Sequence, residues 1–329
     1  MHPAFRVGGR PKLDKAPPVL TAADAPRTVR FTNCRLLRDH ALVTEDLCVR
    51  GGVIIDPKRL FWEGGVADET VDCQGMIIAP GYIDVQLNGG FGADFSTPEG
   101  ISEALTTVAK GVLPHGVTAF LPTIICSKSE AYRAILPHIV PRLGSKDGAA
   151  ILGVHLEGPF LSPHKPGCHP PENLREPGGE PGALRRVCGD HLTHVKLVTL
   201  APELHGADML IAELKSRGVV VAAGHSMATI AQLEASQEVR PHPPPRPPES
   251  RDVWKHASPV LHSPYAPQLG VTMCTHLFNA MPAFTLSEPG LVGVLGSTKQ
   301  PAAYFGLIAD GIHVHPASLK IAVRREYRI

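Results

Sequence analysis

Seven apolar runs that alternate with helix-like stretches constrain the fold of this chain more than any other feature. They follow Ala79 and read YIDVQLN (82–88), VTAFLPTII (117–125), AAILGVHLE (149–157), HVKLVTLAP (194–202), VVVAAGHS (219–226), VTMCTHLF (271–278) and AAYFGLIADG (302–311). Strands that alternate with helices in this way are typical of βα units, in which neighbouring strands run parallel. The sequence therefore predicts an α/β fold around a parallel sheet.

Repetition of these units suggests a (β/α)8, TIM-like barrel over residues 80–329. The first helix should begin with Thr97 as N-cap and Pro98 at its first position. Its buried face should then consist of Ile101, Leu105, Val108 and Val112. Because only seven strand-like runs are present, we expect the barrel to lack strand 8.

The residues before Ala79 follow a different pattern. Residues 1–27 are rich in Pro, Ala and Lys without apolar periodicity, which predicts a disordered leader. Residues 28–79 contain short β-rich pieces separated by the turn sequences RGG and DCQG. We therefore expect a small, incomplete β-sandwich domain in front of the barrel.

A proline-rich segment, residues 238–267, interrupts the alternation between the fifth and sixth strands. It has six prolines between positions 241 and 248. Proline at this density excludes a helix or a central strand, so the segment should be an extended, exposed insertion. It is either a passive loop or a polyproline segment that binds a partner.

The charge balance excludes some classes of function. The chain has 329 residues, with 32 Lys and Arg against 31 Asp and Glu, so nothing attracts it to nucleic acid or to an anionic membrane. No apolar run approaches the roughly 20 residues of a membrane span, and no signal peptide is evident, so we expect a cytoplasmic protein. Seven cysteines without a C-x-x-C pair are expected to be reduced.

The C-terminal ends of the predicted strands carry side chains with metal-binding chemistry. The third run ends in Glu157, the fifth reaches His225 and the sixth reaches His276. In a barrel these ends share one rim, and one carboxylate with two imidazoles can hold a catalytic zinc or a ferrous iron with an open position. Each residue alone could be structural, but three at one rim indicate a metal site.

Five segments together resemble one enzyme family. APGYIDVQLNGGFGADF, GVHLEGPFLSPHKPGCH, GHSMA, THLFNAMPAF and IADGIHVHP are similar, in this order, to the motifs of N-acetylglucosamine-6-phosphate deacetylases, which belong to the amidohydrolase superfamily. The resemblance covers roughly residues 29–325. It implies a barrel of the metal-dependent amidohydrolase type, and hydrolysis of the acetamide of N-acetylglucosamine 6-phosphate to glucosamine 6-phosphate and acetate.

The resemblance also implies site residues. The metal ligands would be Glu157, His225 and His276, and the expected substrate contacts are Cys168, Asn279, Ala280, His313 and Gln86. Many amidohydrolases have His-x-His at the end of strand 1, whereas this chain has Gln86-Leu87-Asn88. That favours one divalent metal. We expect zinc in preference to iron. The sequence IHVH could instead be a metal-binding pair.

The chain departs from the family pattern at three places. The family's proton-transferring aspartate lies on strand 8, which we expect to be absent, and the nearest carboxylate, Asp310, should have its own role in a turn. Ser287 stands where the family usually has an arginine that meets the substrate phosphate. Together with the proline-rich insertion, these features suggest a C-terminally truncated form from an alternative transcript or an imperfect gene model.

Two other functions stay open at this point. The chain could be a catalytically impaired isoform or fragment that acts by association only, or another amidohydrolase that acts on a cyclic amide or a nucleobase. For the deacetylase itself we expect a small amino-sugar phosphate as substrate, no nucleic-acid or membrane partner, and a homodimer in the full-length family.

Overall fold

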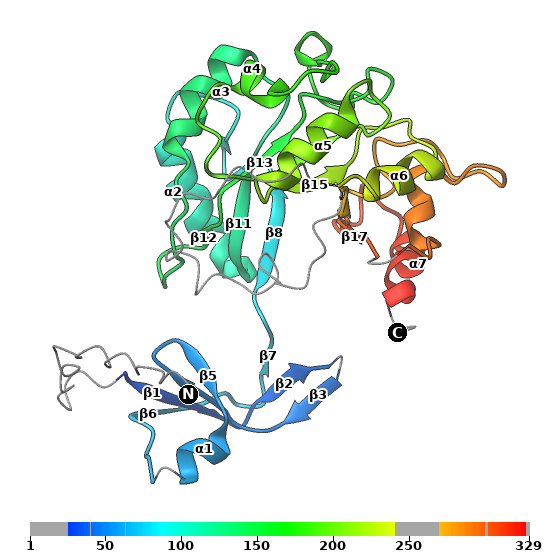
Figure 1. Cartoon of the computed structure of the whole chain (residues 1–329). Helices are drawn as coiled ribbons and strands as arrows, with labels where there is room; N and C mark the ends of the chain where they lie inside the picture. Colours follow the sequence, from blue (N-terminus) through cyan, green and yellow to red (C-terminus); the bar gives the residue numbers. More distant parts are fainter. Residues whose placement is uncertain (1–25, 40, 63, 241–269, 300–301, 327–329) are drawn as a thin grey trace, which may run out of the picture. The chain divides into compact units, whose positions relative to one another are not determined.

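The structure is a computed structural model that describes residues 26–39, 41–62, 64–240, 270–299 and 302–326. These residues divide into two compact units, with the boundary between Pro80 and Gly81 (Figure 1). Most of the predicted leader and of the proline-rich insertion lies outside the described residues. None of the described helices combines the length and the apolar character that crossing a membrane requires.

The first unit contains two small sheets. One has the order β5-β4-β1-β6 and the other β3-β2-β7. Their strands are β1 (Thr28–Thr32), β2 (Arg35–Arg38), β3 (Ala41–Thr44), β4 (Leu47–Arg50), β5 (Val53–Ile55), β6 (Glu69–Asp72) and β7 (Ile77–Ile78), and a short helix α1 (Pro57–Trp62) follows β5. The RGG turn lies between β4 and β5, and its Gly51 and Gly52 adopt positive φ angles that favour glycine. Helix α1 was not expected from the sequence.

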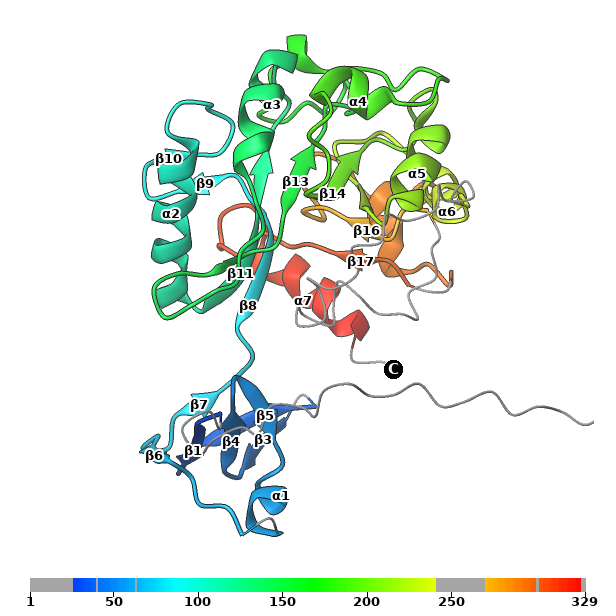
Figure 2. The same cartoon turned by 60° about the vertical axis from the view of Figure 1, so that its left-hand side comes forward.

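The second unit is built on one parallel sheet. Its strands are β8 (Tyr82–Leu87), β11 (Val117–Ile124), β12 (Ala150–Ile151), β13 (Val154–Glu157), β14 (Val195–Leu200), β15 (Val220–Ala223), β16 (Met273–Cys274) and β17 (Tyr304–Phe305). β12 and β13 are two parts of one predicted run, and both pair with β11. The seven runs therefore lie side by side in chain order, in a curled sheet (Figure 2). This confirms the α/β class and a TIM-like barrel that lacks a strand.

The last two strands are shorter than the sequence predicts. The run 271–278 forms a strand only at Met273–Cys274, because His276 and Phe278 adopt positive φ angles that end the extended backbone. The run 302–311 forms a strand only at Tyr304–Phe305. Beyond it, Gly306 still accepts a hydrogen bond from the Leu277 N–H, and no further ladder follows among the described residues.

Helices lie on the outer side of this sheet (Figure 2). They are α2 (Ile101–Val112), α3 (Ser129–Ile135), α4 (Ala183–Cys188), α5 (Ala207–Ser216) and α6 (Ile230–Gln237), and a further helix, α7 (Pro316–Glu326), follows β17. The predicted buried face of α2 is confirmed, but the predicted start at Thr97 is wrong. The helix begins at Ile101 because Gly100, with φ 73°, turns the chain and acts as N-cap. A small hairpin, β9 (Gly89–Gly90) and β10 (Ala93–Asp94), precedes it.

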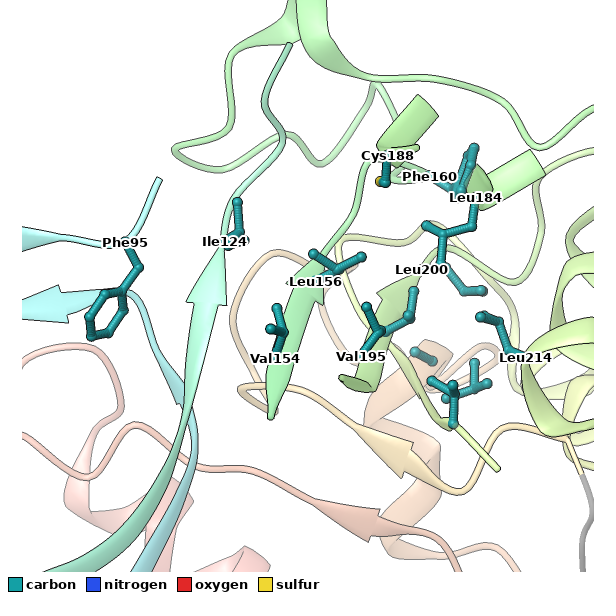
Figure 3. Close-up of a cluster of buried hydrophobic side chains, with 14 of the residues drawn as sticks. Phe95, Ile124, Val154, Leu156, Phe160, Leu184, Cys188, Val195, Leu200 and Leu214 are labelled. Atoms are coloured by element: carbon teal, nitrogen blue, oxygen red, sulfur yellow. The ribbon is translucent and has the colours of Figure 1, made fainter. Parts of the chain in front are cut away.

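Alternation along the strands separates a helix-facing side of the sheet from an inner side. Ile124, Leu156 and Leu200 belong to the main apolar core between sheet and helices (Figure 3). The intervening residues form a smaller inner cluster of Ala119, Leu121, Leu152, Leu197 and Ala222. Since Leu156 is in the main core, the side chain of Glu157 belongs to the inner side.

Candidate metal centre

Glu157, His225 and His276 converge on one point at the C-terminal ends of the strands. Glu157 Oε1 lies 3.1 Å from His225 Nε2 and 3.1 Å from His276 Nε2, and the two nitrogens are 3.0 Å apart. All three residues are buried, with exposed fractions of 3%, 4% and 7%. The structure thus brings together the three residues that the strand-end pattern singled out.

The protonation of His225 makes this cluster suited to a metal ion. Its Nδ1 lies 2.9 Å from the carbonyl oxygen of Lys165, which can only accept, so Nδ1 carries the proton of the neutral ring. Nε2 therefore presents a lone pair to the carboxylate oxygen of Glu157. Two acceptors at 3.1 Å repel each other, and a cation between them removes the repulsion. This donor set fits one divalent metal.

Two amide side chains, one on β8 and one just after it, donate hydrogen bonds to the carboxylate of Glu157. Gln86 Nε2 donates to Oε1 at 2.6 Å, and Asn88 Nδ2 donates to Oε2 at 3.2 Å. Two amide N–H donors, one on each carboxyl oxygen, favour the ionised form of Glu157. Glu157 is therefore a carboxylate, as a metal ligand must be.

His169 is a fourth histidine at the centre. Its side chain is fully buried, and its Nδ1 accepts a hydrogen bond from the Cys126 N–H, so its proton is on Nε2. That Nε2–H has no hydrogen-bond partner among the described residues and lies 3.6 Å from Glu157 Oε2. The ring also meets His225 edge-on, with centroids 4.4 Å apart. His169 thus presents an unused donor at the cluster.

The loop after β13 lies directly against His225. A Cβ atom on Gly167 would come within 2.9 Å of His225 Cε1, so a glycine is required there. The same loop supplies the Lys165 carbonyl and the Ser162 N–H, which donates to the His225 carbonyl at 2.8 Å. This loop therefore forms one wall of the site.

The backbone of the centre is strained. Of the eight non-glycine residues with positive φ in the described part of the chain, four lie here: His225, His276, Phe278 and Ala280. Such conformations cost roughly 1 kcal/mol or more each and persist only where surrounding contacts impose them. Both histidines follow the ends of β15 and β16, and with these φ angles their Nε2 atoms face Glu157 Oε1.

A polar layer lies beneath Glu157 on the inner side of the sheet. His155 is fully buried, with Nε2 2.8 Å from Thr199 Oγ1 and Nδ1 3.2 Å from Thr123 Oγ1. Thr123 Oγ1 also accepts the Leu87 N–H at 2.9 Å. Burial lowers the pKa of His155 to about 4, so the ring is neutral. The layer links the strands that carry Gln86 and Glu157.

The predicted substrate contacts lie in several places. Gln86 contacts Glu157 itself, and Cys168 is exposed beside His169. In the segment after β16, Asn279 has a buried Nδ2 without a hydrogen-bond partner among the described residues, and the Ala280 carbonyl accepts the Ser226 N–H at 3.3 Å. The unpaired amide of Asn279 is a donor available to a ligand.

His313 lies outside the cluster. It is exposed, and its Nδ1 lies 2.6 Å from Asp310 Oδ2. Asp310 also accepts the backbone N–H groups of Ile312 and His313, which lower its pKa to about 2. The expected turn role of Asp310 is confirmed. The alternative metal pair in IHVH gains no support, because the cluster of metal-binding groups found among the described residues contains neither histidine.

Sequence reasoning missed His169, Asn88 as a partner of Glu157, and the role of Glu203 described below. His169 follows Glu157 by twelve positions in an irregular loop, and no periodicity marks it. The only local indication was that His169 directly follows Cys168, which was expected to contact the substrate.

Comparison with known proteins identifies relatives. No family model matches the chain. The N-acetylglucosamine-6-phosphate deacetylase of Danio rerio is 45% identical over 310 residues, which cover 92% of this chain and 69% of the relative. The human enzyme of the same name is 43% identical over 309 residues, with 92% and 68% covered.

Solved structures agree with these relatives. A variant of N-acetyl-D-glucosamine-6-phosphate deacetylase from Mycobacterium smegmatis, solved in complex with N-acetyl-D-glucosamine-6-phosphate, has a TM-score of 0.63 at 25% identity, over 92% of this chain and 68% of that one. The deacetylase from Pasteurella multocida has a TM-score of 0.63 at 26% identity, with 90% and 68% covered. In sequence and in fold, this chain belongs to the N-acetylglucosamine-6-phosphate deacetylase family.

Proposed function

We propose that this chain hydrolyses the acetamide of N-acetylglucosamine 6-phosphate, releasing glucosamine 6-phosphate and acetate. The relatives carry this activity in their names, and the M. smegmatis variant was solved with this compound. The observation that carries the proposal is the buried convergence of Glu157, His225 and His276, in which the lone pair of His225 Nε2 faces Glu157 Oε1, an arrangement that a cation would stabilise.

Glu157, His225 and His276 would hold one divalent metal ion, zinc in preference to iron. Two imidazoles and a carboxylate are ligands that zinc favours, and three protein ligands leave room for water or substrate. When bound, such an ion polarises an amide carbonyl and lowers the pKa of water. Gln86 and Asn88 are occupied with Glu157, which supports a single ion.

The chain's own residues would position the amide. His169 Nε2–H is buried, unpaired among the described residues and directed into the cluster, so it can donate to the carbonyl oxygen of a bound acetamide. Asn279 Nδ2 offers a second buried donor. Cys168, Ala280 and His313 are proposed as further substrate contacts. Asp310 has no proton-transfer role in this proposal, because its carboxylate already accepts three hydrogen bonds in its turn.

Acetate release with metal analysis tests the proposal. Purified chain loaded with Zn²⁺ should contain one ion per chain and release acetate from N-acetylglucosamine 6-phosphate, and Fe²⁺ loading should show which metal supports faster turnover. A chain that binds one ion without releasing acetate at any loading would contradict the proposal and favour a role by association. A cyclic amide hydrolysed in preference would point to another amidohydrolase.

The proposal includes a cytoplasmic homodimer. Light scattering of the purified chain measures the assembly, and fractionation of cells measures the compartment. A monomer at all concentrations, or recovery with membranes, would contradict these two parts without touching the reaction.

A further inference from the structure

Glu203 spans the gap between the ends of two neighbouring strands. It lies three residues after β14, on the same rim as the metal centre, and both of its oxygens are used. Oε2 accepts the Ser226 hydroxyl at 2.6 Å, and Oε1 accepts the Met227 N–H at 2.6 Å. Short, charge-assisted hydrogen bonds of this kind are stronger than neutral ones. Glu203 therefore fixes the two residues that follow His225.

Ser226 transmits this anchoring to the rest of the centre. It is fully buried, and its Oγ, besides donating to Glu203, accepts the Ala228 N–H at 2.9 Å. Its own N–H donates to the Ala280 carbonyl in the segment that follows His276. One carboxylate thus holds the turn after β15 and, through Ser226, ties it to the turn after β16.

The conformation of His225 needs such an anchor. Its φ of 48° is one that a histidine rarely adopts, and it directs Nε2 towards Glu157. The loop after β13 fixes the residue from one side through Ser162 and Lys165. On the other side, the described contacts that hold the backbone after His225 run to Glu203 and Ala280.

We propose that Glu203 is a positioning residue for the metal centre, which holds His225 in its ligand geometry without touching the metal. This inference rests on the proposed function, because it assumes that the cluster binds a metal ion. Its two oxygens are fully engaged with Ser226 and Met227, so Glu203 itself is not a ligand. Partners that orient a ligand typically change metal affinity by about 10- to 100-fold when removed.

Zn²⁺ affinity, measured by competition with a chromophoric chelator, tests the inference together with thermal unfolding. Glu203→Ala should weaken Zn²⁺ binding at least about tenfold, Ser226→Ala less, and Glu203→Gln least, since glutamine keeps one acceptor. The matched control is Glu213→Ala. Glu213 accepts the Gly182 N–H at 2.8 Å near the start of α4, so its loss removes a similar contact outside the cluster.

A metal affinity that falls in Glu203→Ala but not in Glu213→Ala, at comparable thermal stability, would support the inference. If Glu203→Ala does not fold, Ser226→Ala and Glu203→Gln carry the same comparison. Wild-type affinity in the Glu203 variants would overturn the inference, as would equal losses in Glu203→Ala and the control. Failure of the proposed function looks different, because the wild-type chain would then bind Zn²⁺ and release no acetate.

Discussion

The two sides of the parallel sheet differ in strand length. β8, β11 and β14 contain six, eight and six residues, and β13 and β15 contain four each, whereas β16 and β17 contain two each. Glu157 and His225 come from the long-strand side, and His276 comes from the short-strand side. The centre therefore joins a firmly paired half of the sheet to a weakly paired one.

The two histidines reflect this difference. His225 Nδ1 is hydrogen-bonded to Lys165, and its neighbours are tied to Glu203. His276 Nδ1 is buried without a partner among the described residues. A ligand without a hydrogen bond on its second nitrogen is less firmly oriented. From this comparison we expect the long-strand half to preform its ligands, whereas His276 would depend more on a bound metal ion.

The largest effect is expected when the short-strand half loses its metal ligand, His276. Among the described residues, His276 is the one metal-binding group that the short-strand half contributes to the cluster. His276→Ala should therefore lower Zn²⁺ affinity by more than about 100-fold, beyond what removal of a supporting contact causes. Chelator competition and acetate release measure this. His313→Ala, outside the cluster, is the control for metal affinity alone and should keep its metal. Tight binding by His276→Ala would show that this half supplies no ligand.

Truncation of a core side chain should lower the free energy of unfolding more in the long-strand half than in the short-strand half. Leu156 on β13 is fully buried, so Leu156→Ala should lower the free energy of unfolding by about 3 kcal/mol. Leu307, just after β17, is only partly buried, and Leu307→Ala should cost about 1 kcal/mol. Urea denaturation of both variants gives the two values. Equal losses would mean that the short-strand side is packed as firmly as the other.

Binding of a metal ion should stabilise the short-strand half of the sheet more than the long-strand half. A ligand present at 100 times its dissociation constant stabilises the state that it binds by about 2.7 kcal/mol. We expect amide hydrogen exchange in residues 271–280 and 302–307 to slow on addition of Zn²⁺, with little change in β11 and β14. Protection that rises uniformly over the sheet would contradict a preformed half.

The smallest effect is expected from substitution of Ser287, which lies between β16 and β17 in the sequence. This residue is exposed, and the family resemblance leads us to expect an arginine at its position. A charge-assisted bond to phosphate contributes about 1.5–3 kcal/mol, of which an exposed site retains only part. Ser287→Arg should therefore lower KM for N-acetylglucosamine 6-phosphate by a few fold and leave KM for the unphosphorylated sugar unchanged. Steady-state kinetics with both sugars measure this.

Much of the second unit follows from its sequence because buried strands require continuous apolar runs. The seven runs, the buried face of α2 and the rim position of Glu157, His225 and His276 are all consequences of local periodicity. The start of α2 at Ile101 and the early ends of β16 and β17 are not, because they depend on φ angles at Gly100, His276 and Phe278. Local composition does not reveal such angles.

Long-range contacts account for the rest of what sequence reasoning missed. Glu203 meets Met227 across 24 residues, and His169 meets Glu157 across a loop without regular structure. No spacing in the sequence distinguishes Glu203 from a solvated glutamate, or His169 from a surface histidine. Only the folded rim brings these side chains together.

The order of the strands in the sheet has a consequence for synthesis of the protein. Each strand from β8 to β17 lies beside the run that precedes it in the chain, so pairing can follow translation from one edge of the sheet to the other. Glu157 and His225 leave the ribosome before His276 does. Capture of a metal ion by all three ligands would then have to follow synthesis of the sixth strand run.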